Sequence, residues 1–62
     1  MNYAEAIKAL RKKMLITQTE LAELLGVAFV SVNRWENGAY EPTMKAKRKL
    51  AALFLENGIE VK

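Results

Sequence analysis

The sequence predicts an all-α protein, and three observations in its 62 residues support that prediction. Apolar residues recur every three or four positions in four segments, as they do on one face of a helix. Residues that commonly cap or end helices stand between these segments. No linker or low-complexity tract divides the chain, and a chain of this length has room for one core. We therefore expect a single compact domain over residues 1–62.

The first segment is predicted to be a helix over about residues 2–14. The side chain of Asn2 can cap this helix, and Glu5 follows three residues later, where a capping box has its acidic residue. The apolar stripe of the segment consists of Tyr3, Ile7 and Leu10.

The second and third segments are predicted to be short helices over about residues 18–25 and 28–37. Thr17-Gln18-Thr19-Glu20 is a T-x-x-E capping box directly before the second segment. Gly26 and Gly38 follow the two segments, and glycine readily adopts the left-handed backbone that often ends a helix. Ala28, Val32 and Trp35 share one face of the third segment.

The fourth segment is predicted to be a helix over about residues 44–56. Pro42 blocks the preceding residues from helix, and Thr43 can cap the helix that follows. Its apolar positions are Ala46, Leu50, Leu53 and Phe54. Asn57 and Gly58 end it and begin the tail, residues 57–62. Apolar and polar residues alternate over 59–62, as they do in a short strand.

The composition of the chain excludes several classes of function. Ten Lys and Arg against seven Asp and Glu give a net charge of +3, which is compatible with a polyanionic partner. The absence of cysteine and histidine excludes disulfides, thiolate metal sites and the commonest general base. No apolar run approaches the roughly 20 residues that span a bilayer. We therefore expect no enzyme, no metal, no cofactor and no membrane partner, and the sequence shows no sign of a small-molecule ligand.

The two central helices predict a helix-turn-helix, because about three residues join them and Gly26 stands at the bend. Ala22 is small at the point where the second helix of the pair has to cross the first closely. The other apolar positions between Gln18 and Asn37 are Leu21, Leu25, Val27, Val32 and Trp35. Chance alone rarely produces this whole set of intervals.

With these residues the sequence resembles the Cro/C1-type (XRE-like) helix-turn-helix DNA-binding domains of phage repressors and bacterial regulators. The resemblance runs from about Ile7 to Leu53 and is densest over residues 17–27 and 33–38. It implies a lambda-repressor-like fold of four helices, or five, whose third helix enters the DNA major groove. It also implies a transcriptional regulator, with repression favoured, that binds a palindromic operator as a homodimer. Such a protein is cytoplasmic, prokaryotic or phage-encoded, and associated with the nucleoid.

The resemblance assigns base contacts to Phe29, Val30 and Arg34, and Asn33 lies beside them on the same exposed face. The guanidinium of Arg34 can bond bidentately to guanine O6 and N7. The alternative for Arg34 is a solvated or phosphate-bound side chain.

Phe29 and Val30 depart from the polar residues that are common at these family positions. They can contact thymine methyl groups, a recognised form of base recognition. Alternatively, Phe29 folds under the helix as core. A third interpretation is that the Phe29–Val30 surface binds a protein, which would make the chain an antitoxin-like or adaptor module with a toxin or another regulator as partner.

The resemblance assigns phosphate contacts to residues on either side of the third helix: Gln18, Asn37, Tyr40, Thr43 and Lys45. The alternatives are a plain first-turn residue for Gln18, a helix cap for Asn37 and simple solvent exposure for the other three. Arg11 and Glu36 match positions that form a partly buried ion pair in some family members, and we expect this pair to have a structural role.

Overall fold

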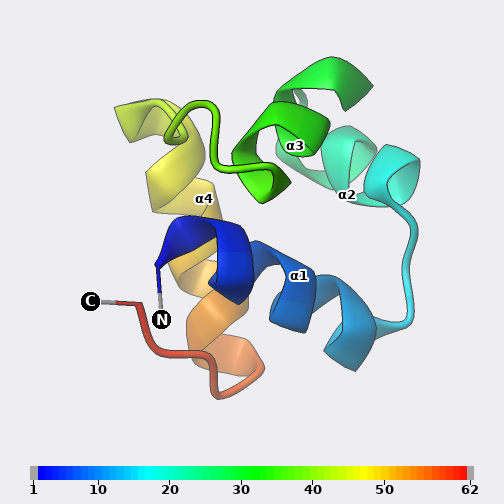
Figure 1. The fold of residues 1–62 in the computed structure, drawn as a ribbon. Helices are drawn as coiled ribbons and strands as arrows, with labels where there is room; N and C mark the ends of the chain where they lie inside the picture. Colours follow the sequence, from blue (N-terminus) through cyan, green and yellow to red (C-terminus); the bar gives the residue numbers. More distant parts are fainter. Residues whose placement is uncertain (1, 62) are drawn as a thin grey trace.

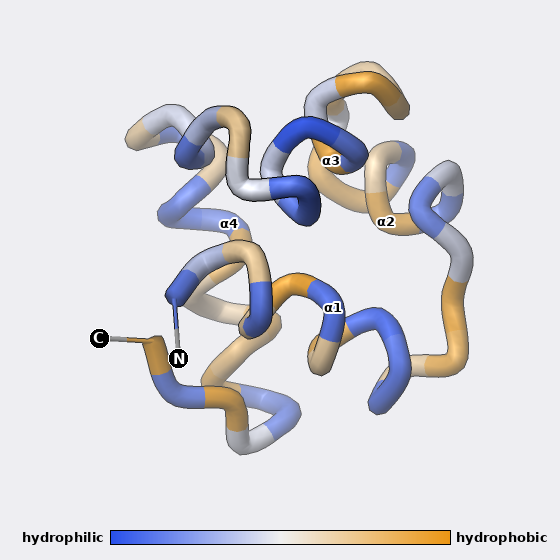
Figure 2. Tube along the Cα trace, viewed as in Figure 1, coloured by the Kyte–Doolittle hydropathy of each residue, from blue (hydrophilic) through white to orange (hydrophobic). Residues whose placement is uncertain are grey.

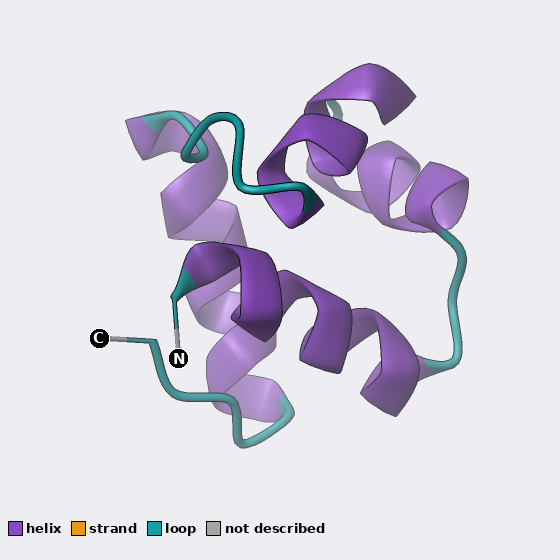
Figure 3. Ribbon diagram, in the orientation of Figure 1, coloured by secondary structure: helices purple, strands orange, loops and turns teal. Residues whose placement is uncertain are grey.

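A computed structural model describes residues 2–61, in which four helices and no strand are found (Figures 1 and 3). The helices are α1 (Tyr3–Met14), α2 (Gln18–Leu25), α3 (Phe29–Glu36) and α4 (Met44–Glu56). The expected all-α fold is therefore confirmed. None of these helices is both long enough and apolar enough to cross a membrane.

Short polar side chains start three of the helices. Asn2 Oδ1 accepts from the backbone N–H of Glu5 at 2.9 Å, and Thr43 Oγ1 accepts from that of Ala46 at 3.3 Å. Thr17 and Glu20 form a complete capping box. Each bond satisfies a backbone donor that a helix N-terminus leaves free. Ala28 precedes α3 without any side-chain cap, so packing against neighbouring helices has to hold that helix.

The ends of α1 and α2 depend on left-handed residues. Gly26 ends α2 with φ +70°, as its position in the sequence predicts. Leu15 ends α1 with φ +58°, a conformation that is unfavourable for a leucine. A further contact closes α2, because Lys49 Nζ of α4 donates to the Leu25 carbonyl at 3.0 Å. This cation lies where the negative end of the helix dipole favours it.

The core lies where the four helices meet. α3 packs on α1 and α2, while α4 packs on the same two helices (Figure 1). The buried apolar side chains are Ala6, Ile7, Leu10, Leu21, Ala22, Leu25, Val32, Trp35, Ala46, Leu50 and Phe54. Ala28, which shares one face with Val32 and Trp35 in the helical pattern, is exposed. It precedes the first turn of α3, where the chain has not yet entered the helix.

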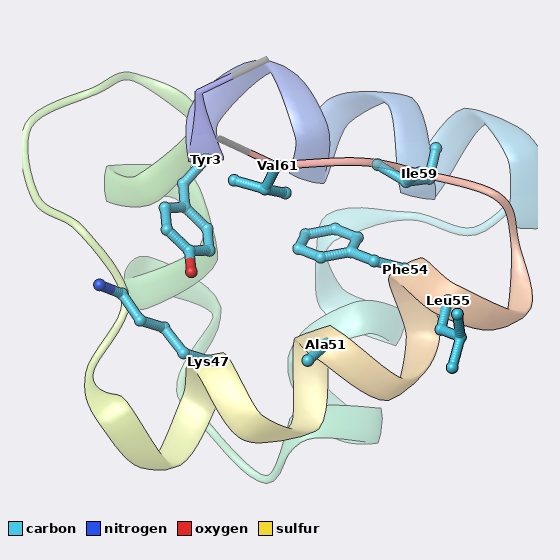
Figure 4. A pocket seen from close by; sticks show the side chains of 7 residues that line it. All are labelled: Tyr3, Lys47, Ala51, Phe54, Leu55, Ile59 and Val61. Carbon is cyan, nitrogen blue, oxygen red and sulfur yellow. The ribbon is translucent and has the colours of Figure 1, made fainter.

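The tail forms no strand over the described residues 59–61, and the strand suggested by its alternation was wrong. Ile59 and Val61 instead pack against the core and cover part of its apolar surface. Figure 4 shows the tail crossing close to Phe54 of α4 and Tyr3 of α1, whose ring centroids lie 6.5 Å apart. Together they line a hollow of about 300 Å³. The last residue of the tail, Lys62, and Met1 at the other end lie outside the described residues.

Candidate nucleic-acid interface

One side of α3 faces solvent while the other enters the core. Val32, Trp35 and Glu36 are buried, whereas Phe29 and Val30 remain 49% and 45% exposed. The first turn of α3 is accordingly hydrophobic at the surface, and the turn that follows is hydrophilic (Figure 2). The interpretation of Phe29 as a core residue was therefore wrong. Phe29 is the first residue of α3, and its side chain lies on the solvent-facing side of the helix.

Arg34 lies on the exposed side of α3, next to the loop that leads to α4. Its guanidinium carbon is 5.6 Å from the centre of the Tyr40 ring, within the range of a cation–π contact. Arg34 and Tyr40 line a hollow of about 250 Å³ together with Ser31, Trp35, Glu41 and Thr43. The α3–α4 loop thus stands beside the exposed face of α3 and extends it.

Three side-chain amides form a chain of hydrogen bonds between α2 and the end of α3. Asn37 Nδ2 donates to Asn33 Oδ1 at 3.2 Å, and Asn33 Nδ2 donates to Gln18 Oε1 at 3.3 Å. Gln18 Nε2 then donates to Glu36 Oε1 at 3.1 Å. Each NH₂ group has two hydrogens and uses one of them here. One N–H of each amide therefore remains available to an outside acceptor.

The Glu36 carboxylate anchors this amide chain and pairs with Arg11 of α1. Arg11 Nη2 donates to Glu36 Oε1 at 2.8 Å, and its Nε donates to Oε2. Burial by itself raises the pKa of Glu36. Hydrogen bonds from Arg11 and Gln18 and the charges of Arg11 and Lys8 outweigh burial and hold that pKa below 4.5. The carboxylate is thus charged at neutral pH, although only 4% of Glu36 is exposed.

Two lysines at the start of α4 differ in their surroundings. Lys47 bonds to Glu41 at 3.0 Å, which raises its pKa, and its Nζ lies 4.9 Å from the centre of the Tyr3 ring. Lys45 is exposed, and within residues 2–61 no acidic side chain forms an ion pair with it. Thr43 caps α4, and its hydroxyl keeps its own hydrogen to donate. Lys45 and Thr43 are therefore free to contact a phosphate, while Lys47 is already engaged.

The helix-turn-helix family model matches residues 7–54 of this chain. The chain belongs to the helix-turn-helix family. Its type is Cro/C1, a group of DNA-binding transcriptional regulators. HTH-type transcriptional regulator DicA of Escherichia coli (strain K12) is 42% identical over 45 residues, which are 73% of this chain and 33% of DicA. The chain thus spans about a third of the length of this curated relative.

A solved structure agrees with the family assignment. The DNA-binding domain of the P22 c2 repressor, determined by nuclear magnetic resonance in solution, superposes with a TM-score of 0.78 at 30% sequence identity. The match covers 94% of this chain and 84% of that domain. Both the helix-turn-helix and the helices that support it are therefore common to the two folds.

Within this helix-turn-helix protein, the structure brings together most of the residues that the sequence singles out. Base-contact candidates Phe29, Val30, Asn33 and Arg34 share the exposed side of α3. The phosphate candidates lie on two flanks of that side. Gln18 and Asn37 join Asn33 on one flank, and Tyr40, Thr43 and Lys45 lie in the α3–α4 loop and the start of α4. In the described part of the chain, no group of three or more acidic side chains is placed to hold a metal ion.

Sequence reasoning missed two features of this surface. The amide chain was not foreseen, although Gln18, Asn33 and Asn37 are the polar residues at the start of α2 and along α3. Lys8 was not among the predicted site residues, yet its charge acts on Glu36 and adds a cation beside the Gln18 flank. Its place three residues before Arg11 was the available signal, because residues three apart share a helix face.

Proposed function

We propose that residues 1–62 act as one sequence-specific domain that binds double-stranded DNA and regulates transcription. The observation that supports this best is the exposed side of α3, bordered on both flanks by free hydrogen-bond donors. An α-helix with its side chains is about 10–12 Å across. A major groove about 12 Å wide accepts such a helix. Such a protein binds and does not catalyse, and it belongs in the cytoplasm, on the nucleoid.

The exposed side of α3 would supply the base contacts. Arg34 is the candidate for guanine, because its donors are free and its fork matches O6 and N7. Phe29 and Val30 offer apolar surface to thymine methyl groups, and Asn33 offers one amide N–H. A bidentate Arg–guanine pair is worth about 1–3 kcal/mol of discrimination against other bases.

The two flanks would hold the DNA backbone on either side of α3. Gln18 and Asn37 each keep one amide N–H for a phosphate oxygen. On the other flank, the hydroxyl groups of Tyr40 and Thr43 and the ammonium group of Lys45 would donate to phosphate oxygens. Such contacts set the register of the protein on the duplex and the salt dependence of binding. The ion pair between Arg11 and Glu36 would not contact DNA but would hold α1, α2 and α3 together.

One copy contacts only a few base pairs, so we propose that two copies bind a palindromic operator as a homodimer. Their recognition helices would lie about 34–36 Å apart, one turn of the duplex. Repression follows most simply from such binding, because a chain on an operator blocks other proteins from it.

A second candidate function rests on one observation, the half-exposed pair Phe29 and Val30. An exposed apolar pair beside polar residues also suits a protein partner. In that case the chain would be an antitoxin-like or adaptor module, with a toxin or another regulator bound to this surface.

Selection of bound sequences from a random duplex pool tests the first proposal, followed by affinity measurements at two salt concentrations. We expect a palindromic sequence to be enriched and its affinity to fall steeply with salt. Arg34→Ala should relax specificity at one base pair of each half-site. Lys45→Ala should weaken binding to all duplexes alike and reduce the salt slope by about 1.

The control is Lys13→Ala, which removes the same charge from the last turn of α1. That turn and the start of α4 lie on opposite sides of the molecule (Figure 1). Lys13→Ala should leave the salt slope nearly unchanged. No enrichment, with only weak salt-sensitive binding, would reject sequence-specific DNA binding and favour the protein partner at the Phe29–Val30 surface.

A further inference from the structure

The contact between Arg34 and Tyr40 leads to an inference that rests on the proposed function. We propose that Tyr40 is a positioning residue, whose ring orders the Arg34 guanidinium for guanine recognition before DNA arrives. The sequence suggests only a phosphate contact for Tyr40. The structure places its ring 5.6 Å from the guanidinium carbon of Arg34, from the loop between α3 and α4.

The contact with the ring leaves the donors of Arg34 free. A cation–π contact is an electrostatic attraction to the aromatic ring and supplies no hydrogen-bond acceptor, so the five N–H groups of the guanidinium keep their capacity to donate. Within residues 2–61, no side chain and no carbonyl oxygen accepts a hydrogen bond from the Arg34 guanidinium. A carboxylate partner would occupy the same fork that guanine needs. The ring of Tyr40 restricts the motion of the Arg34 side chain and leaves its N–H donors free.

The acidic residue closest in sequence to Tyr40 is occupied elsewhere. Glu41 lines the same hollow as Arg34, so it is the carboxylate most able to pair with it. Its Oε1 instead bonds to Lys47 Nζ at 3.0 Å, and Lys47 also lies over the Tyr3 ring. Because Lys47 binds the Glu41 carboxylate, this carboxylate does not pair with Arg34.

Backbone bonds hold the ring in place relative to Arg34. The N–H of Ala39, the residue before Tyr40, donates to the carbonyl of Arg34 itself at 3.1 Å. Gly38, with φ +76°, donates to Trp35 at 3.1 Å, and Pro42 is buried on the other side of the ring residue. The backbone directly before Tyr40 is thus bonded to the last turn of α3, and the residue two positions after it is buried. Its ring is 63% exposed, so core packing does not explain why an aromatic residue stands there.

Two variants separate positioning from phosphate contact. Tyr40→Phe keeps the ring and removes the hydroxyl, whereas Tyr40→Leu removes the ring. Each is measured on the selected duplex and on a duplex with the guanine opposite Arg34 replaced. We expect Tyr40→Leu to reduce discrimination between the two duplexes by about two- to five-fold, the range for an exposed cation–π contact. Tyr40→Phe should retain the discrimination of the wild type.

The same variants in an Arg34→Ala background complete the test, because Tyr40→Leu should then cause no further loss of discrimination. A loss of affinity that is equal on both duplexes, and equal for Tyr40→Phe and Tyr40→Leu, would overturn positioning in favour of a phosphate contact. Urea unfolding of each variant shows whether the fold is retained, since the exposed ring should contribute little to stability.

A measurement without DNA distinguishes failure of this inference from failure of the proposed function. In the free protein, the NMR order parameter of the Arg34 Nε–H group should fall in Tyr40→Leu and not in Tyr40→Phe. If the order parameter is the same in all three proteins, the inference is wrong whatever the chain binds. If Tyr40 orders Arg34 but the wild type selects no duplex, the proposed function fails, and with it the assignment of this order to guanine.

Discussion

Leu15, the residue that ends α1, has a backbone conformation that is unfavourable for leucine. It closes α1 in the left-handed region, at φ +58° and ψ +45°, with 89% of its surface exposed. A leucine there pays about 1–2 kcal/mol for the clash of its Cβ and gains little from burial. No pattern in the sequence indicates this conformation, because a glycine or asparagine is the usual signal for it.

We predict that Leu15→Gly stabilises the protein. Relief of the left-handed strain exceeds the extra chain entropy that glycine adds to the unfolded state, which is about 0.4–1 kcal/mol. The free energy of unfolding, measured by urea denaturation, should rise by about 0.5–1 kcal/mol. Leu55→Gly is the matched control, an exposed leucine within α4, and it should lower the same quantity by about 1 kcal/mol. Equal effects of the two variants would contradict the argument.

Among the candidate site residues, exposure followed from spacing but contacts did not. The helical period correctly separated Arg34 and Asn33 from Val32 and Trp35. It left two positions possible for Phe29, solvent or core, since a residue at the very start of a helix is not yet constrained by its turn. The contact of Arg34 with Tyr40 could not be predicted, because Tyr40 lies in a loop whose course the sequence does not define.

At the scale of the element, α3 is the helix with the weakest local signals. Its residues Ser31 and Asn33 are poor helix formers, and Ala28 gives it no side-chain cap. Its neighbours α1 and α2 hold it by packing. The helix α3 is thus held by tertiary contacts, whereas specific contacts stabilise both ends of α2: the capping box at its start, and Gly26 with Lys49 at its end.

We predict that Ala28→Ser stabilises α3. Ala28 already has the extended backbone of an N-cap, at φ −73° and ψ +149°, and it is exposed. A serine hydroxyl there can accept one of the free backbone N–H groups, which is worth about 0.5–2 kcal/mol. The midpoint of urea unfolding should rise accordingly.

The control for Ala28→Ser is Ala52→Ser, an exposed alanine in the middle of α4. Serine is a weaker helix former than alanine, so this change should lower stability by a few tenths of a kcal/mol, of order 0.5. A gain at both positions would indicate a general effect of serine, and no gain at position 28 would mean that α3 starts in a different way.

For the whole molecule, the ion pair between Arg11 and Glu36 joins three helices. Arg11 comes from α1 and Glu36 from α3, and Gln18 of α2 bonds to the same carboxylate. The folded-state pKa of Glu36 lies below the value of 4.5 expected for an unfolded chain. Its contribution to stability is therefore complete above pH 4.5 and is lost as the pH falls through the folded pKa, because the unfolded chain takes up the proton first.

We predict that the free energy of unfolding falls as the pH is lowered from about 5 to 3, and that Glu36→Gln removes part of this fall. At pH 7 Glu36→Gln should cost about 1–3 kcal/mol, less than the loss of a fully buried pair because Arg11 is partly exposed. Urea unfolding at a series of pH values, at constant ionic strength, measures both effects. Glu23→Gln changes an exposed carboxylate and should leave the pH profile nearly as it is. If the pH dependence of the free energy of unfolding is unchanged in Glu36→Gln, this carboxylate does not cause the loss of stability at low pH.

The sequence by itself determined the helical content, the starts of α1, α2 and α4, and the helix-turn-helix at its centre. Capping, helical spacing and glycine ends act between residues a few positions apart, so they can be recognised along the chain. Only the tertiary structure decided the contacts of Arg34 with Tyr40, of Lys49 with the end of α2, and of the tail with the core. It also decided that Gln18, Asn33 and Glu36 form one network. These contacts join different elements, and packing of the whole core sets which of them meet.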